Sequence, residues 1–236
     1  MIVRMARRIP GTRRLLGAGA LIAAGGCFSL GRPTPPLEAY VLGQGPRATA
    51  AAPARDGGGV TIGLRRLDLA PYLSSTAIVV RHGSRIVTSG FRRWGEEPSA
   101  GILRAVARSL AGAPAILAVD VAPWSVAARH DYLVQLHVAH LEGVMAEDST
   151  AMEGEVRVTA SWEIIRSEDG TLVARGETDR RATGWKVGDY AGLVARLDQG
   201  LAGLGGDLAA CLARIGPPGP AADSTTARRL VVCRGP

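Results

Sequence analysis

The sequence of 236 residues predicts an α+β fold, in which two helices pack on one face of a mixed, largely antiparallel sheet. Several segments alternate apolar and other residues, which is typical of half-buried strands. Two longer segments repeat apolar residues at three- and four-residue steps, which indicates helices. Each helical segment follows a group of strand segments, and this order favours an α+β fold.

Four strands are expected before the first helix. Glu38 to Leu42 predicts a short strand, and Val60 to Leu64 alternates clearly. Ala77 to Arg81 and Arg85 to Thr88 are rich in β-branched residues and flank the turn residues His82-Gly83-Ser84. Two such segments around a short glycine-containing loop predict a β-hairpin.

The first helix is expected to begin at Pro98. Proline suits the first helical position, and the helix dipole favours the preceding carboxylates of Glu96 and Glu97. Its apolar face consists of Ile102, Leu103, Val106, Ala107 and Leu110. Arg104 and Arg108 lie on the opposite face, so we expect the apolar side to cover a sheet.

Three further strands are expected after this helix. They are Ala115 to Val121, Asp131 to Glu142 and Glu155 to Ile164, of which the last alternates most regularly. Asp169-Gly170 then predicts a tight hairpin turn into a strand from Thr171 to Arg181.

The second helix has the strongest periodicity in the sequence. Its apolar residues are Tyr190, Leu193, Val194, Leu197, Leu201, Leu204, Leu208, Cys211, Leu212 and Ile215. The remaining face carries Arg196, Asp198, Gln199 and Asp207. Gly216-Pro217-Pro218 ends the helix, and a short apolar segment, Leu230 to Val232, follows near the end of the chain.

Residues 1–26 resemble a lipoprotein signal peptide. Five arginines precede the apolar segment from Leu15 to Ala24, which is too short to cross a hydrocarbon core of about 30 Å. Ala24-Gly25-Gly26 precedes Cys27, which we expect to carry lipid after cleavage. Phe28, where aspartate would favour retention in the inner membrane, favours the outer membrane. The alternatives are a plain secretory signal or a misplaced start codon.

The sequence predicts four regions. The signal peptide of residues 1–26 is followed by a lipidated cysteine and proline-rich tether at 27–37, which would extend by about 3.1 Å per residue. A domain at 38–215 contains a stretch expected to form a loop, Arg47 to Gly59, and a proline-rich tail occupies 216–236. Removal of residues 1–26 lowers the net charge from +7 to +2. With Lys186 as the single lysine and 4% aromatic residues, we do not expect nucleic-acid binding.

Cys211 and Cys233 are the two cysteines that would remain after lipidation of Cys27. An oxidising periplasm would allow them to form a disulfide. Because Cys211 also falls on the apolar face of the second helix, a buried free thiol is the alternative. Counting thiols under denaturing, non-reducing conditions separates the two.

No motif in the sequence predicts catalysis, a cofactor or a metal. The sequence lacks a Gly-x-x-x-x-Gly-Lys phosphate loop and a Gly-x-Ser-x-Gly nucleophile elbow. His130, His137 and His140 lack the spacing of a metal site, and the last two would face opposite sides of a strand. Trp94, Trp124, Trp162 and Trp185 are scattered and are expected to anchor a core or interface. We therefore expect no enzyme, and a lipid-anchored hydrolase would lack its nucleophile.

Six motifs appear in a characteristic order behind the signal. They are Pro71-Tyr72-Leu73, Val80-Arg81, Arg93-Trp94-Gly95-Glu96-Glu97-Pro98, Asp131-Tyr132-Leu133-Val134, Val158-Thr159-Ala160-Ser161-Trp162 and Asp189-Tyr190-Ala191-Gly192-Leu193-Val194. Over residues 38–215 the chain resembles the ABC-type transport auxiliary lipoproteins, the PqiC-like family. The helix entry is one residue longer than usual, and the tail after Ile215 has no counterpart.

The resemblance implies a non-catalytic subunit anchored in the outer membrane and facing the periplasm. Its partners would be MCE-domain and ABC permease subunits, and the ATPase indirectly, in a system that moves lipids between membranes; a homo-oligomer is also compatible. The alternative is a stand-alone envelope lipoprotein that binds lipid or assists assembly of an outer-membrane complex.

The sequence also suggests where a partner could bind. The sheet face away from the helices carries Arg157, Thr159 and Ser161, and the segment before the first helix carries Arg93 and Trp94. These residues are candidates for a partner surface, and an ordinary solvated face is the alternative.

Overall fold

The computed structural model describes residues 35–44, 59–147, 152–218 and 230–235. The predicted signal peptide, Cys27, most of the tether, the stretch from 45 to 58 and the tail from 219 to 229 lie outside these residues.

Strand β7 (Tyr132–Met145) is the centre of the sheet. Along one edge it pairs antiparallel with β8 (Glu153–Arg166), which in turn pairs antiparallel with β9 (Leu172–Lys186). Along its other edge three short strands follow one another, each parallel to β7: β2 (Val60–Leu64), β3 (Asp68–Leu69) and β4 (Ala77–His82).

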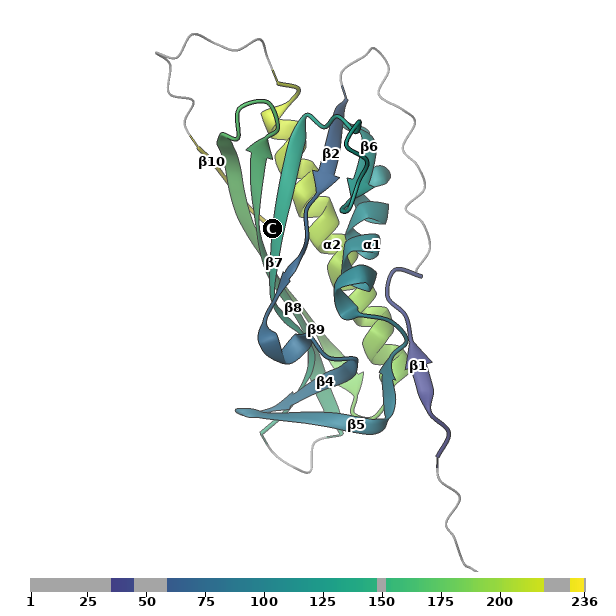
Figure 1. Ribbon diagram of the computed structural model, residues 1–236. Helices are drawn as coiled ribbons and strands as arrows, with labels where there is room; N and C mark the ends of the chain where they lie inside the picture. Colours follow the sequence, from purple (N-terminus) through teal and green to yellow (C-terminus); the bar gives the residue numbers. More distant parts are fainter. Residues whose placement is uncertain (1–34, 45–58, 148–151, 219–229, 236) are drawn as a thin grey trace, which may run out of the picture. The chain divides into compact units, whose positions relative to one another are not determined.

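The remaining strands extend the sheet on both sides (Figure 1). The predicted hairpin is confirmed: β4 turns at Gly83, which has a φ of 58°, into β5 (Arg85–Trp94). The end of β5 pairs in parallel with β1 (Glu38–Tyr40). Strand β6 (Ile116–Val121) pairs with β2, and β10 (Val231–Arg234) pairs in parallel with β9.

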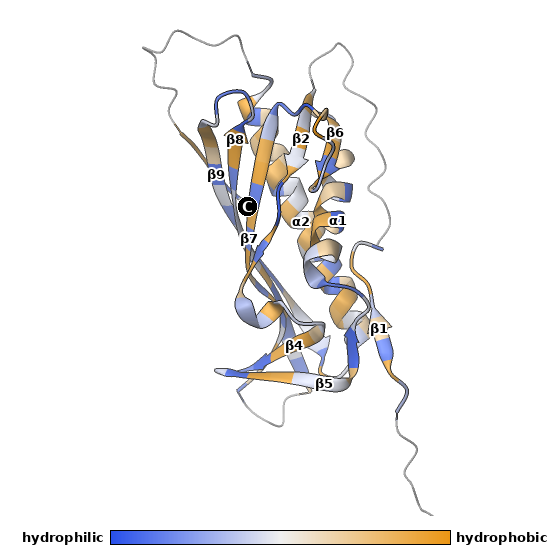
Figure 2. Cartoon of the chain, viewed as in Figure 1, coloured by the Kyte–Doolittle hydropathy of each residue, from blue (hydrophilic) through white to orange (hydrophobic). Residues whose placement is uncertain are grey.

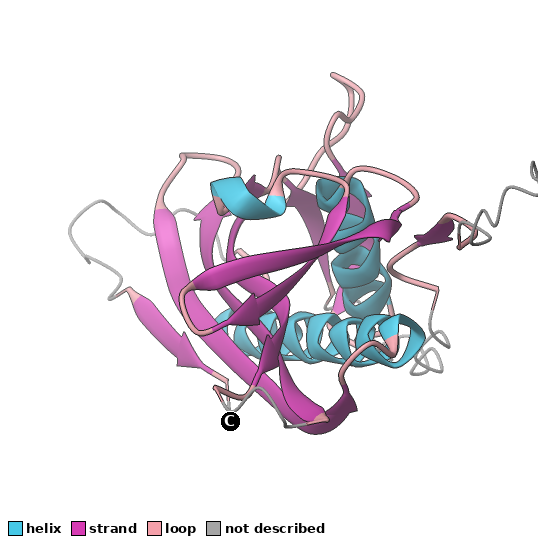
Figure 3. Cartoon of the chain, turned by 90° about the horizontal axis from the view of Figure 1, so that it is seen from below, coloured by secondary structure: helices cyan, strands magenta, loops and turns pink. Residues whose placement is uncertain are grey.

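Helices α1 (Pro98–Ala111) and α2 (Tyr190–Ile215) contact each other on the same side of the sheet (Figure 3). Helix α2 packs on β8 and β9, and α1 packs on β6. Pro98 is the first helical residue, and Asp189 caps α2 by accepting a hydrogen bond from Gly192 N at 2.8 Å. The mixed sheet with two helices confirms the predicted α+β fold.

The apolar residues of the alternating strands and both helices form one core. In β8 the side chains predicted to face inward are each at most 2% exposed: Val156, Val158, Ala160, Trp162 and Ile164. Figure 2 shows hydrophobic positions, in orange, along both helices and along the central strands. Burial of a large apolar side chain contributes roughly 1.5–3 kcal/mol, so this ladder is a main source of stability.

Two local predictions are wrong. Asp207, which the sequence places on the polar face of α2, is 8% exposed and pairs with Thr178 and Arg180 of β9. The second strand of the hairpin continues beyond Thr88 to Trp94, because β1 pairs with its last residues. Both differences come from segments that are distant in the sequence.

No described helix combines the length and the hydropathy that a membrane-spanning helix requires.

Candidate functional site

A bulge in β7 determines which of its side chains face away from the helices. Tyr132 through Val138 are buried at alternate positions, but the pairing with β8 shifts between Val138 and His140. A bulge adds one residue and re-aims the side chains that follow. Leu141 therefore continues the core, whereas His140 and Glu142 face outward.

These two residues belong to a polar set on the outer face of the sheet, the face opposite α1 and α2. We call this set the outer polar belt: Tyr72, Arg81, His140, Glu142, Arg157, Thr159, Asp179 and Arg181. It crosses β4, β7, β8 and β9, with Tyr72 contributed by the short 3-10 helix η1 (Pro71–Leu73).

Glu142 is the buried centre of the belt, with a side chain that is 0% exposed. Arg81 binds it with both ends of its guanidinium, Nε at 2.7 Å from Oε1 and Nη2 at 3.1 Å from Oε2. His140 Nδ1 lies 3.1 Å from Oε1 of the same carboxylate. Because a buried carboxylate is costly without partners, these contacts fix β4 and β7 to each other.

Tyr72 fastens η1 over this ion pair. Its hydroxyl donates to the carbonyl oxygen of Ala139 at 2.8 Å and lies 3.1 Å from His140 Nδ1. The guanidinium carbon of Arg81 lies 5.3 Å from the centre of the Tyr72 ring, within cation–π distance. Burial, assisted by the nearby Glu142 carboxylate, raises the pKa of Tyr72 to about 12.

Arg157 continues the belt on β8, directly opposite Glu142 in the ladder. Its Nε lies 3.1 Å from Thr159 Oγ1 and 3.3 Å from Asp179 Oδ1. The hydroxyl of Thr159 donates to Asp179 at 2.8 Å, and this hydrogen bond is the main reason that the pKa of Asp179 is lowered. Arg181 donates to the other oxygen of the same carboxylate. The belt therefore consists of hydrogen-bonded charges that another polar protein surface can meet.

The structure separates the residues predicted for a partner surface. Arg157 lies in the outer polar belt, whereas Arg93 is exposed at the β1 end of β5. Trp94 is 5% exposed and packs in the core, so it cannot contribute its ring to a partner surface. Its prediction as a surface residue is wrong because its side chain belongs to the cluster of buried core residues.

The three histidines do not converge. His130 Nε2 lies 2.8 Å from Asp120 Oδ2, and His137 Nδ1 lies 3.2 Å from Asp68 Oδ2. His140 belongs to the belt. Among the described residues no group of three histidine, cysteine or acidic side chains is arranged to hold a metal.

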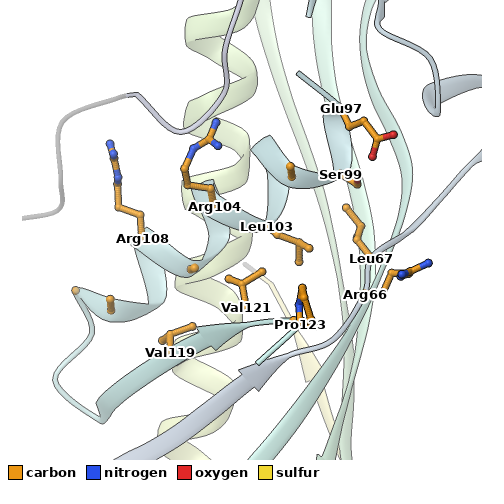
Figure 4. Close-up of a pocket in the computed structure, with 15 residues that line it drawn as sticks. Arg66, Leu67, Glu97, Ser99, Leu103, Arg104, Arg108, Val119, Val121 and Pro123 are labelled. Carbon is orange, nitrogen blue, oxygen red and sulfur yellow. The ribbon is translucent and has the colours of Figure 1, made fainter. Parts of the chain in front are cut away.

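A groove with a volume of about 1170 Å³ lies between α1 and β6. We call it the α1–β6 groove. Leu103, Val121 and Pro123 lie close together at its floor (Figure 4). Arg104 and Arg108 extend away from this floor. An apolar floor with polar groups at the edges is typical of sites for amphipathic ligands.

The two glutamates before α1 have different roles. Glu96 pairs with Arg104, which also donates to the carbonyl oxygen of Leu42 at 2.8 Å. Glu97 occupies the N-cap position of α1 and lines the α1–β6 groove. The pair thus forms no catalytic dyad, in agreement with their interpretation as a helix start.

Cys211 and Cys233 are joined in a disulfide with a Cα–Cα distance of 5.8 Å. The bond connects α2 to β10, so the last described strand is held to both the sheet edge and the helix layer. This arrangement buries both cysteines next to the core.

A protein-family model described as "ABC-type transport auxiliary lipoprotein component" matches residues 40–209. No curated protein matches the chain.

Two solved structures resemble this fold. A Xanthomonas campestris protein assigned to the DUF330 family is 18% identical, with a TM-score of 0.56 over 73% of this chain and 90% of its own. A crystal structure described only as an uncharacterized protein is 15% identical, with a TM-score of 0.52 over 64% of this chain and 90% of its own. At these identities the likeness shows the fold alone.

Proposed function

Since the chain belongs to the ABC-type transport auxiliary lipoprotein family, we propose that it is a non-catalytic subunit of an ABC/MCE-type system that moves lipids between membranes. The family match over residues 40–209 is the observation that carries this proposal. The family is one of auxiliary lipoprotein components and not a known enzyme family.

The anchor is a lipid on Cys27, held in the outer membrane with the domain in the periplasm. The signal-like residues 1–26 and the small residues before Cys27 support this assignment. The proline-rich tether allows the domain to lie up to about 30 Å from the lipid surface, at about 3.1 Å per residue.

The partner surface is the outer polar belt around Arg157. A buried ion pair at Glu142 holds its backbone in place, and the half-buried Arg157 with the exposed Asp179 and Arg181 presents alternating charges. Alternating charges specify register with a partner more than they add affinity. The partner would be an MCE-domain subunit, with the permease as a further contact and the ATPase reached only through the permease.

Site-specific photo-crosslinking in cells tests this surface. A photoreactive phenylalanine analogue replaces Arg181 of the belt, and the control replaces Val126, which is fully exposed in the segment after β6. We expect adducts with an MCE-domain subunit from position 181 and none from position 126. Adducts with an outer-membrane barrel protein alone, or equal adducts from both positions, would contradict the proposal.

The α1–β6 groove favours a second function, that of a stand-alone envelope lipoprotein that binds lipid. Its apolar floor suits an acyl chain. Native mass spectrometry of the protein purified from membranes tests this. Leu103→Trp, which fills the floor, should abolish any bound lipid, whereas Leu117→Trp at an exposed position should not.

A further inference from the structure

Exposed apolar side chains gather on β5 and around β1. Five large apolar residues of this region are between 37% and 53% exposed: Leu37, Val41, Ile86, Val87 and Phe91. Single exposed apolar residues are normal on a protein surface, but a group of them marks an interaction site. We call this group, together with Arg85, Arg92 and Arg93, the β5 arm.

The backbone explains why the β5 arm is open. Strand β1 pairs with residues 92–94 of β5, so among the described residues no strand pairs with this edge of β5 from Arg85 to Phe91. In the same parallel register the residues before β1 would continue along this edge. Pro35 and Pro36 lack the N–H groups that such a ladder requires, so these two residues cannot continue the pairing of β1 along this edge.

The successive residues Ile86 and Val87 are both exposed. Neighbouring side chains of a strand point to opposite faces, so both faces of the hairpin are open here. Figure 2 shows apolar residues in this part of β5, and Figure 3 shows the hairpin from the side on which it projects. Soluble proteins protect such long apolar edges, which indicates that something covers this one.

The charge of the β5 arm is positive. Arg85 and Arg93 are exposed and form no ion pair with a described residue. Arg92 pairs with Glu38 at 3.2 Å and lies 5.2 Å from the centre of the Tyr190 ring. Glu38 thus pairs with one of the three arginines, and the two further guanidinium groups make the arm complementary to an anionic surface.

The arm also lies where the tether joins the domain. Leu37 is ten residues after Cys27 and immediately precedes β1. We propose that the β5 arm rests on the anionic phospholipid surface in which Cys27 is anchored; this rests on the proposed anchoring. Its apolar side chains enter the boundary between headgroups and acyl chains, and its arginines bind lipid phosphates.

A second copy of the chain is the competing occupant. Two β5 edges that paired with each other would bring the unpaired Arg85 and Arg93 of both copies close together. Like charges across a strand pair are destabilising. Lipid phosphates neutralise these same charges, so the observations favour the bilayer.

Fluorescence labelling of the mature lipoprotein in vesicles of phosphatidylethanolamine and phosphatidylglycerol tests the proposal. An environment-sensitive dye is attached to Phe91→Cys and, as a control, to Leu117→Cys on β6, which is 63% exposed. With vesicles, iodide should quench the dye at position 91 about threefold less than the dye at position 117, because the arm is buried in headgroups. Equal quenching would overturn the proposal, and so would protection of position 91 without vesicles, which indicates a second copy.

The role of charge is tested by Arg85→Glu together with Arg93→Glu. This variant should restore quenching at position 91, whereas Arg129→Glu, an exposed arginine elsewhere, should not. The mass of the mature protein separates the two proposals. A mature protein without lipid at Cys27 would overturn the proposed anchoring. In that case a histidine tag at residue 28 would bind the protein to vesicles that contain nickel-chelating lipid. Quenching of the dye at position 91 would then still test the contact of the β5 arm with the lipid surface.

Discussion

At the residue scale, one extra residue in β7 determines how the outer face is built. The alternation of Tyr132, Val134, Leu136 and Val138 could be predicted, but the bulge that follows could not, because it depends on the ladder with β8. Without the bulge, Glu142 would point into an apolar core. With it, the carboxylate meets Arg81 on the other side.

Glu142→Gln should therefore lower the free energy of unfolding by about 1–3 kcal/mol, because Arg81 keeps a partly buried charge without its carboxylate. Urea denaturation measures the change. Glu163→Gln on the neighbouring strand is the control, since Glu163 is exposed and its side chain has no partner among the described residues. We expect the control to change stability by less than about 0.5 kcal/mol. Equal effects would contradict the role of the pair.

Tyr72 makes the stability of the fold change with pH in the alkaline range. Its folded-state pKa of about 12 lies above the ordinary value of 10.0, so the folded chain holds the phenolic proton more tightly. The stabilisation is complete below pH 10.0 and is lost as the pH rises towards 12. Tyr72→Phe should lose this part of the pH dependence, as measured by denaturation between these pH values.

The comparison of wild type with Tyr72→Phe cancels other groups, including Tyr40, whose pKa is raised chiefly by its hydrogen bond to Glu38. At neutral pH the variant should lose about 1 kcal/mol, because the hydrogen bond to Ala139 is removed. Identical alkaline profiles for the two proteins would show that Tyr72 is not the titrating group.

At the element scale, the local pattern of apolar residues predicted most helices and strands. It could not predict which distant strands pair with each other. The bounds of α2 and the alternation of β8 follow from the spacing of apolar residues within each of these segments. The parallel pairing of β2, β3 and β4 with β7 depends on residues far ahead in the chain. Asp207 was misplaced for the same reason, since Arg180, its partner, lies on β9.

The contact between β7 and Trp185 requires a glycine. A Cβ on Gly143 would lie 2.7 Å from Cζ3 of Trp185, which is fully buried. Gly143→Ala should therefore destabilise the protein by about 1–3 kcal/mol through overpacking. Gly90→Ala in β5 is the control, because a Cβ there meets nothing within 4 Å. Thermal denaturation of both variants measures the difference in their melting temperatures. Equal melting temperatures would refute the packing argument.

The disulfide should stabilise the fold because it closes a loop and so restricts the unfolded chain. Cys211 and Cys233 are 22 residues apart, and a loop of this length corresponds to about 3 kcal/mol in the chain-entropy description. Replacing both cysteines by alanine should lower the free energy of unfolding by about this amount. Thiol counting on the denatured, non-reduced protein provides the check on the bond itself, and two free thiols would disprove it.

At the scale of the whole molecule, the lipid anchor determines where the protein acts. Cys27→Ser should abolish incorporation of a fatty-acid analogue and release the domain from the outer membrane, as shown by membrane fractionation. Phe28→Asp is the matched variant: it should keep the label and move the protein to the inner membrane. Incorporation of label by Cys27→Ser would contradict the assignment of the anchor.

The way β2, β3 and β4 follow one another along β7 bears on the order in which the chain can fold. Ile62 pairs with Tyr132 and Val80 pairs with Gly143, so each waits for a partner more than sixty residues later. During synthesis and export the edges of β2, β3 and β4 that face β7 therefore have no partner, although β4 and β5 can already form their hairpin. These edges stay unpaired until β7 has emerged, and the sheet then forms from its centre outward.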